Sequence, residues 1–213
     1  MSSHRIGSGN ASTPEQSPEA AGIERLRSAA EHCRACALWR GATQTVFGSG
    51  PAHARIVMLG EQPGDREDRD GQPFVGPAGR VLDQALERAG IDRRSVYLTN
   101  VVKHFKWKPR GKRRIHMTPS QIEIVACQPW FWAEMKAIEP EVLVVLGAVA
   151  AKAVVAPGFR VTQKRGKPLP GPLGTTLVAT VHPSSILRGD PEQREALLAA
   201  LASDLAVARN VLA

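Results

Sequence analysis

The chain alternates between short apolar runs and longer segments whose apolar residues recur at helical spacing. Four of the runs are apolar on both faces and predict buried strands, at residues 55–59, 96–102, 141–146 and 177–181. Helical spacing and capping residues predict helices at residues 23–37, 76–89, 118–138, 147–155 and from 190 onward. Strands that alternate with helices indicate a parallel sheet covered on each side. We therefore predict an α/β fold, a three-layer α/β/α sandwich with a central sheet of about four parallel strands.

The first 21 residues differ in composition from the rest. They are rich in Ser, Gly, Pro and Glu and hold almost no large apolar side chains, which is typical of a disordered tail. Residues 22–213 then form a single domain. The longest apolar run, 142–151, ends at Lys152 and is shorter than the ~18 residues of a membrane helix. No apolar stretch near the start is typical of a secretory signal, so we expect a cytoplasmic monomer with no membrane partner.

Basic residues outnumber acidic ones and gather in one segment. The 213 residues include 28 Lys and Arg against 20 Asp and Glu, a formal net charge of +8, and 43% apolar residues, enough for a sizeable core. No acidic residue lies between Asp92 and Glu123, and residues 103–114 hold seven basic and two aromatic side chains. A solvated basic loop would explain this segment. Cations interleaved with aromatic rings also suit phosphate contact and base stacking, so we favour a nucleic-acid partner.

Three polar motifs follow predicted strands, at the ends where ligands bind in parallel α/β folds. Residues 60–65 (GEQPGD) follow the first strand, Asn100 lies near the end of the second, and residues 182–185 (HPSS) follow the fourth. Together they offer a carboxylate, an amide and an imidazole, which indicates a pocket. Asn100 is either a structural cap or a partner for a planar imide such as uracil. Phe74 is either a core residue or a flat surface on which a base stacks.

The three cysteines suggest a metal site. They cannot all pair, so a disulfide framework is excluded and reduced thiols are expected. Cys33 and Cys36 form a CxxC pair, and with Cys127 they need a fourth ligand to hold zinc or an iron–sulfur cluster. His104, just after the second strand, is a candidate. The alternative is a redox CxxC pair with Cys127 as a buried apolar filler. Because this CxxC does not open a helix after a strand, we favour the metal site.

Several segments together resemble the uracil-DNA glycosylase superfamily, specifically its iron–sulfur family 4. They occur in the family's order and cover most of residues 31–189. The matching stretches are GEQPGDREDRDGQPFVGPAGR, VYLTNVVKHFKW, ACQPW, VLVVLGAVAAKA and VATVHPSS. Residues 112–116 (KRRIH) are similar to the loop that marks the UdgX group, whose members remove uracil and stay covalently attached to DNA. Gln62 and His104 replace a small residue and a cysteine of family 4, and both replacements are similar to the UdgX pattern.

The resemblance implies roles for the side chains of the predicted pocket. Asn100 would read the edge of uracil, and Phe74 would stack on its ring. His182 would hydrogen-bond the uracil O2 and help to carry charge on the leaving group. Glu61 matches the carboxylate of the first motif. Two further residues would shape the pocket beside it, Gln62 and Asp65.

The resemblance also implies a nucleophile and a cofactor. His116 would bond C1′ of the deoxyribose, and Arg114 would position its loop. A [4Fe–4S] cluster would be held by Cys33, Cys36, His104 and Cys127. Zinc in the same site is an alternative.

Residues 183–188 have two possible roles. Ile186 and Leu187 could wedge into the base stack beside phosphate-binding serines such as Ser184, because the target nucleotide must leave the duplex to be reached. Alternatively, the two apolar side chains pack against the last helix.

The chemistry of N-glycosidic cleavage agrees with these roles. Cleavage produces an oxocarbenium-like sugar and an anionic base. Donors are needed around the departing uracil, and a negative charge near the sugar. A neutral His182 can donate to O2. Glu61 can stabilise the cation, or act as a base for water or for His116, whose neutral imidazole is a competent nucleophile.

Three hypotheses follow. The leading one is a DNA-repair enzyme that excises uracil from single- or double-stranded DNA and forms a histidine–C1′ adduct. The nearest alternative is a hydrolytic family 4 glycosylase that turns over and leaves a free abasic site. A rival of another class is a zinc-containing nucleic-acid-binding module without catalysis, which would explain the basic segment and the cysteines but not the three motifs.

Overall fold

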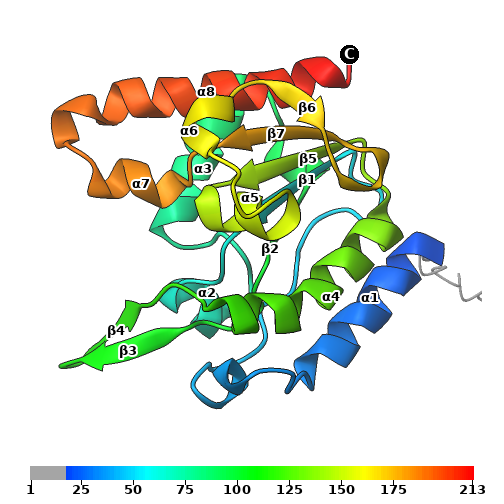
Figure 1. The fold of residues 1–213 in the computed structure, drawn as a ribbon, viewed down its shortest axis with the longest axis vertical. Helices are drawn as coiled ribbons and strands as arrows, with labels where there is room; N and C mark the ends of the chain where they lie inside the picture. Colours follow the sequence, from blue (N-terminus) through cyan, green and yellow to red (C-terminus); the bar gives the residue numbers. More distant parts are fainter. Residues whose placement is uncertain (1–17) are drawn as a thin grey trace, which may run out of the picture.

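A five-stranded sheet runs through the centre of the protein, which we describe over residues 18–213 of a computed structural model (Figure 1). The strands lie in the order β2-β1-β5-β7-β6. Their bounds are β1 Ile56–Gly60, β2 Val96–Asn100, β5 Val142–Leu146, β6 Pro168–Pro170 and β7 Thr176–Thr180. The first four strands in this order are mutually parallel, and β6 runs antiparallel to β7. The predicted α/β sandwich is confirmed.

The fifth strand, β6, was not predicted. It has three residues and a proline at each end. Proline has no backbone N–H to donate to a neighbouring strand, so a segment with two prolines is confined to the edge of a sheet. Such a short segment also lacks the apolar run by which the other strands were predicted.

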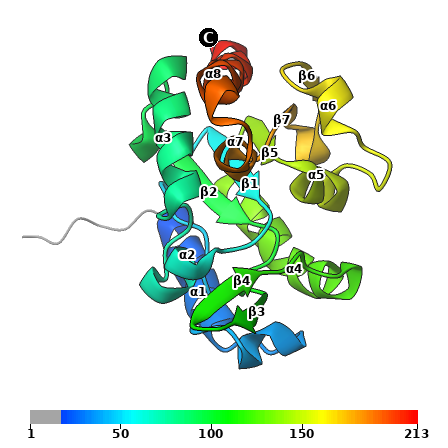
Figure 2. The ribbon, with the colours of Figure 1, turned by 90° about the vertical axis from the view of Figure 1, so that its left-hand side faces the viewer.

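Helices cover both faces of the sheet (Figure 2). On one face, α3, α7 and α8 share a core with strand residues such as Met58 and Val144. On the other face, α4 and α5 share a core with Val57 and Val145, and α1 packs against α4. The helix bounds are α1 Pro18–Glu31, α2 Asp65–Asp70, α3 Pro77–Ala89, α4 Gln121–Ile138, α5 Ala148–Val154, α6 Val161–Lys164, α7 Pro183–Arg188 and α8 Arg194–Val211. Within residues 18–213, no helix is long and apolar enough to cross a membrane.

The first helix lies earlier in the chain than the sequence pattern predicts. It starts at Pro18 and ends at Glu31, so the prediction of a helix through residue 37 was wrong. The chain turns after Ala30, and Cys36 is extended (φ −140°, ψ 165°) before a short 3₁₀ turn at Ala37–Arg40. The CxxC pair therefore lies on a connecting segment. The predicted disordered tail falls outside the described residues up to residue 17, and its last four residues belong to α1.

The basic segment forms a hairpin rather than a loop. Strands β3 (Trp107–Arg110) and β4 (Arg113–His116) pair antiparallel, with Trp107 opposite His116. Gly111 makes the turn with φ of 59°, a left-handed conformation that favours glycine. Figure 1 shows the hairpin projecting from the body of the protein below the carboxyl ends of the sheet. His116 is the last residue of β4, so the root of the hairpin carries it.

A buried ion pair fixes the end of β2. Lys103 Nζ lies 2.5 Å from Glu134 Oε2, and the two side chains are 1% and 0% exposed. Lys103 also donates to the Asn100 carbonyl at 2.8 Å, and Glu134 accepts from the Gly48 amide at 3.0 Å and from Tyr97 and Thr99. The pair therefore ties α4 to the strand end that carries Asn100.

Candidate functional site

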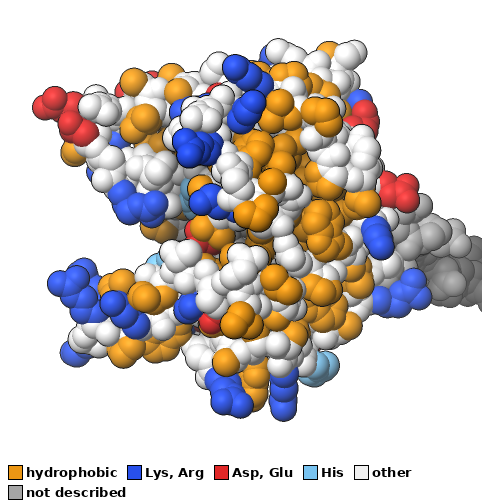
Figure 3. Space-filling view, in the orientation of Figure 1, with side chains coloured by type: hydrophobic (Ala, Val, Ile, Leu, Met, Phe, Trp, Pro, Cys, Tyr) orange, Lys and Arg blue, Asp and Glu red, His pale blue; other side chains and the backbone are white. Residues whose placement is uncertain are grey.

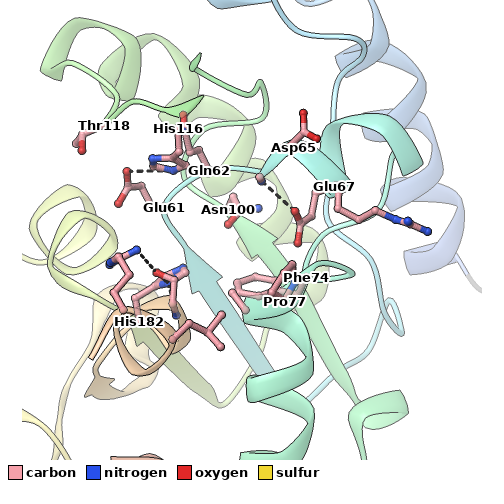
Figure 4. A pocket seen from close by; sticks show the side chains of 16 residues that line it. Glu61, Gln62, Asp65, Glu67, Phe74, Pro77, Asn100, His116, Thr118 and His182 are labelled. Atoms are coloured by element: carbon pink, nitrogen blue, oxygen red, sulfur yellow. Dashed lines mark hydrogen bonds and ion pairs between the residues drawn. The ribbon is translucent and has the colours of Figure 1, made fainter. Parts of the chain in front are cut away.

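A cavity of about 740 Å³ opens at the carboxyl ends of β1, β2 and β7. Figure 3 shows a hollow on this side of the molecule, with Lys and Arg side chains along both of its edges. Figure 4 shows the side chains that line the cavity. The cavity brings together most of the predicted site residues. They are Glu61, Gln62, Asp65, Phe74, Asn100, His116, His182 and Ser184. Arg114, His104 and the three cysteines do not line it.

His116 and Glu61 face each other across the mouth of the cavity (Figure 4). The His116 Nε2 and Glu61 Oε1 atoms are 3.8 Å apart, and the side chains are 46% and 20% exposed. Glu61 Oε1 is buried and makes no hydrogen bond with any residue of 18–213. Burial raises the pKa of Glu61, which the charge of Arg188 partly opposes. Burial and then Arg188 lower the pKa of His116, so the arrangement favours a neutral imidazole at neutral pH.

Hydrogen bonds around His182 determine which of its nitrogens carries the proton. The Ser184 backbone amide donates to His182 Nδ1 at 3.2 Å, and the Ser184 hydroxyl lies 2.8 Å from the same nitrogen. Because Nδ1 accepts from the backbone amide, it carries no proton, and the Ser184 hydroxyl, which accepts from Arg188 Nη1 at 2.9 Å, can also donate to it. His182 therefore carries its proton on Nε2. Burial, Arg188 and His116 lower the pKa of His182 to about 4, so it is a neutral donor at neutral pH.

Asn100 and Phe74 are held close to the end of β1. A Cβ on Gly60 would lie 2.4 Å from Asn100 Oδ1 and 2.6 Å from Phe74 Cζ, so only glycine leaves room for both side chains. Phe74 has φ of 57°, which is rare for a residue with a side chain, and its carbonyl accepts from Arg93 Nη2 at 3.1 Å. The Phe74 ring lies 6.3 Å from the His182 ring at an interplanar angle of 28°. The absence of a side chain at Gly60 thus lets both residues pack against the end of β1.

Gln62 lines the cavity, but its amide is engaged with the hairpin. Its Nε2 donates to the Met117 carbonyl at 3.0 Å and to the Lys106 carbonyl at 3.3 Å, and its Oε1 accepts from the Lys106 amide at 3.1 Å. Lys106 precedes β3 and Met117 follows β4. Gln62 therefore bridges the two ends of the hairpin and sets the position of His116.

Arg114 also anchors the hairpin instead of facing the cavity. It donates to Asp65, to Asp68 Oδ2 at 2.6 Å and to Thr43 Oγ1 at 3.1 Å. Asp68 is fully buried on α2. Although burial opposes the shift, hydrogen bonds from Arg69 and Arg114 lower the pKa of Asp65. Arg114 therefore ties the hairpin to α2 and to Thr43, and it does not line the cavity.

The two apolar side chains of residues 183–188 differ in their surroundings. Ile186 is 3% exposed and packs in the core of α3 and α8, whereas Leu187 is 37% exposed and lines the cavity. Ser184 is a partner of His182 and Arg188. Of the two apolar side chains, Leu187 alone is free to act as a wedge.

The three cysteines lie in one region, away from the cavity. Burial raises the pKa of Cys127 to about 11; Lys103 opposes this shift, and the charges of Cys33 and Cys36 add to it. Cys127 Sγ accepts from the Lys103 amide at 3.2 Å, and Cys33 Sγ accepts from Trp130 Nε1 at 3.1 Å. No three His, Cys, Asp or Glu side chains within residues 18–213 are arranged around one metal-ion position.

The hydrogen bonds of His104 show which ring nitrogen keeps its lone pair. Its Nε2 lies 2.9 Å from Thr45 Oγ1, and that hydroxyl donates to the Ala30 carbonyl at 3.0 Å. Thr45 must then accept from His104, which puts the imidazole proton on Nε2 and leaves the lone pair on Nδ1. Three thiols and one imidazole lone pair fit the donor set of a thiolate-rich cluster.

Glu67 is a functional residue that the sequence interpretation missed. Its Oε2 accepts from the Gly64 amide at 3.1 Å and its Oε1 from the Gly76 amide at 2.8 Å. The carboxylate thus joins the loop after β1, which carries Glu61, to the loop that carries Phe74. A Glu three residues after the N-cap of a helix, here Gly64, is a capping signal that could have revealed half of this contact.

We predict that Glu67→Gln lowers the free energy of unfolding by about 2 kcal/mol, because an amide NH₂ would face one of the two backbone N–H groups and leave it unpaired while buried. Denaturant unfolding measures the change. Glu87→Gln, at an exposed position of α3, is the control and should unfold like the unaltered protein. Equal stability of the two variants would show that the Glu67 contacts contribute nothing.

Comparisons with known proteins identify the family of this chain. The family model described as the uracil DNA glycosylase superfamily matches residues 47–206. The type-4 uracil-DNA glycosylase of Thermotoga maritima is 38% identical over 167 residues, which cover 78% of this chain and 83% of the relative. The type-4 uracil-DNA glycosylase of Pyrobaculum aerophilum is 33% identical over 173 residues, which cover 78% of this chain and 85% of that protein. This chain therefore belongs to the uracil DNA glycosylase superfamily.

Proposed function

We propose that this chain excises uracil from DNA and then captures the abasic deoxyribose covalently on His116. Membership of the superfamily and the type-4 relatives support the excision. One observation carries the capture: His116 Nε2 lies 3.8 Å from Glu61 Oε1 at the mouth of the cavity that holds Asn100, Phe74 and His182.

Excision requires the uracil to enter this cavity and leave as an anion. The Asn100 amide can donate to O4 and accept from N3–H, and the Phe74 ring offers a face for stacking. As the C1′–N1 bond breaks, its electron pair leaves with the uracil, and the Nε2–H of His182 donates to O2, where negative charge develops. The sugar becomes an oxocarbenium-like cation that the Glu61 carboxylate stabilises.

Capture then joins His116 to the sugar. The neutral imidazole, with its proton on Nδ1, uses the lone pair of Nε2 to bond to C1′ and takes over the positive charge of the oxocarbenium. The Glu61 carboxylate stabilises the resulting N-alkylimidazolium. Loss of the Nδ1 proton to solvent then leaves a neutral N-alkylimidazole, and the uracil anion takes up a proton from solvent. Gln62 and Arg114 contribute by holding the hairpin that presents His116.

A hydrolytic enzyme that turns over is the second candidate. The buried, unpartnered Oε1 of Glu61 favours it, because the same oxygen could take a proton from a water molecule that attacks C1′. His116 would then only contact the DNA.

The DNA partner is supported by the surface around the cavity. Lys108, Arg110, Lys112 and Arg113 on the hairpin are exposed, and Arg188 lies on the opposite side of the cavity. Such side chains suit the phosphates of a strand that delivers its uracil between them. The preference for uracil and the monomeric, cytoplasmic state stay predictions.

We propose that a [4Fe–4S] cluster is held by Cys33, Cys36, Cys127 and His104. When bound, such a cluster would supply a rigid link between the segment after α1, the segment after β2 and α4. The thiols must be deprotonated to act as ligands, so binding would release protons. Zinc held by the same four residues is the competing assignment.

The adduct is tested with a labelled uracil-containing oligonucleotide, boiled in SDS and run on a denaturing gel. We expect a shifted, heat-stable band from the unaltered protein. His116→Ser should abolish the band but retain some uracil release, because His182 and Asn100 are intact, and His53→Ser at an exposed position should behave like the unaltered protein. A normal adduct yield from His116→Ser would refute the assignment. An unshifted product that breaks under alkali would establish the hydrolytic candidate, and no uracil release would favour the binding module.

Adduct formation should weaken as the pH falls. The active forms are the Glu61 carboxylate, whose pKa is raised above 4.5, and the neutral His116, whose pKa is lowered below 6.5. Both forms are complete above these pKa values and are lost on acidification, whereas His182, with a pKa of about 4, stays neutral. Single-turnover rates from pH 4 to 8 should therefore rise and level off near neutrality.

Arg188→Gln should move this acid limb of the rate profile to higher pH, because the cation lowers the pKa of both Glu61 and His116. Arg94→Gln is the control, because Arg94 precedes the amino end of β2, pairs with Asp92 and is not among the charges that shift the pKa of Glu61 or His116. A limb that stays in place or moves to lower pH in Arg188→Gln would contradict the assigned electrostatics.

The cluster is tested by composition. The purified protein should be brown, with broad absorbance near roughly 400 nm and with iron and sulfide in similar amounts. Cys127→Ala should lose most of the iron, and His104→Cys should keep it, because a thiolate can replace the imidazole. A colourless protein that contains zinc and remains active would overturn the cluster assignment.

A further inference from the structure

A second, smaller groove lies directly beside the uracil cavity. It measures about 350 Å³ and runs between α3, α7 and α8, which lie side by side in Figure 2. Pro77 and Leu187 line both hollows and form a ridge between them. The two sites are therefore separated by the thickness of one pair of side chains.

The groove has an apolar floor and a basic rim. The floor consists of side chains that are no more than 9% exposed, and they are Val81, Ile186 and Leu198. The rim carries Arg80 and Arg194, and both are exposed. The acidic side chain of the groove, Glu195, is neutralised by Arg88 at 2.5 Å. The groove thus offers an apolar surface between net positive charges.

Contacts within the groove hold its ridge in place. Arg194 Nη2 donates to the Leu187 carbonyl at 3.2 Å, which ties the start of α8 to the end of α7. Leu187 itself is 37% exposed, although Ile186 beside it is buried. An exposed leucine on a fixed ridge between two hollows is placed to separate two neighbouring groups of a ligand.

We propose that this groove binds the nucleotide adjacent to the uracil on the same strand, with its base over the apolar floor and its phosphate at Arg80 and Arg194. The inference rests on the proposed function. When a nucleotide occupies the cavity, the next nucleotide of the same strand lies within one backbone repeat of the ridge formed by Pro77 and Leu187. The positive rim matches a phosphate, and the apolar floor matches the face of a base. The enzyme would then hold two successive nucleotides, one on each side of Leu187.

The test uses single-stranded oligonucleotides with a 2′-fluorinated deoxyuridine, whose fluorine disfavours the cationic sugar and so prevents excision. One oligonucleotide is complete. In the other two, a tetrahydrofuran abasic analogue replaces the nucleotide on the 5′ or on the 3′ side, which removes the base and retains the phosphate. We expect the protein to bind one of the two abasic oligonucleotides about fivefold more weakly than the complete oligonucleotide. It should bind the other abasic oligonucleotide as tightly as the complete one.

Two variants locate this effect in the groove. The first is the double variant Arg80→Gln and Arg194→Gln, which should bind the complete strand more weakly. It should also reduce the slope of log Kd against the logarithm of salt concentration by about 0.7 for each phosphate that it no longer neutralises. Gln84→Trp, at an exposed position that lines the groove, should fill it and make the protein insensitive to the missing base. Arg94→Gln is the control, because the exposed Arg94 side chain pairs with Asp92 and does not line the groove, and this variant should bind all three strands like the unaltered protein.

Equal binding of the three strands by the unaltered protein would overturn the proposal, as would a Gln84→Trp variant that still distinguishes them. Sensitivity that appears only in duplex DNA would assign the groove to the complementary strand instead, and would also overturn it. Uracil release from the unfluorinated strands is measured separately. Release without any effect of the flanking base refutes the groove alone, whereas no release from any strand refutes the proposed function.

Discussion

The ion pair between Lys103 and Glu134 is the contact through which the two chemically distinctive regions are joined. Both charges are buried, and loss of one partner would leave the other uncompensated, at a cost of about 3–5 kcal/mol. Lys103 holds the Asn100 carbonyl with its ammonium group and the Cys127 sulfur with its backbone amide. One residue therefore links the end of β2, where the uracil edge would be read, to the cysteine region on α4.

The central sheet and much of the cavity could be predicted because both depend on local sequence patterns. Fully apolar runs such as 142–146 have few alternatives to a buried parallel strand, and the topology then brings the residues after each strand to one edge. Glu61, Asn100 and His182 converge for this reason, since each lies at or just beyond a strand end.

The contacts that position these residues could not be predicted, because their partners are distant in the chain and lack distinctive side chains. Gln62 binds backbone groups 44 and 55 residues away, and a backbone carbonyl leaves no signal in a sequence. The sequence pattern predicts a loop in place of the hairpin because the two strands are basic and largely exposed, and so lack an apolar alternation. Glu67 resembles an ordinary surface residue of α2 until the fold places the Gly76 amide against it.

Arg188 shows how one exposed cation can tune several groups of the site together. Its charge lowers the pKa of Glu61, His116 and His182, which favours the carboxylate of the first and the neutral rings of the other two. All three are the forms that excision and capture require. Its guanidinium also orders Ser184, and through it the proton on His182. A DNA phosphate beside Arg188 would offset part of this charge, so the histidines depend on burial as well, and burial is the larger cause of both of their pKa shifts.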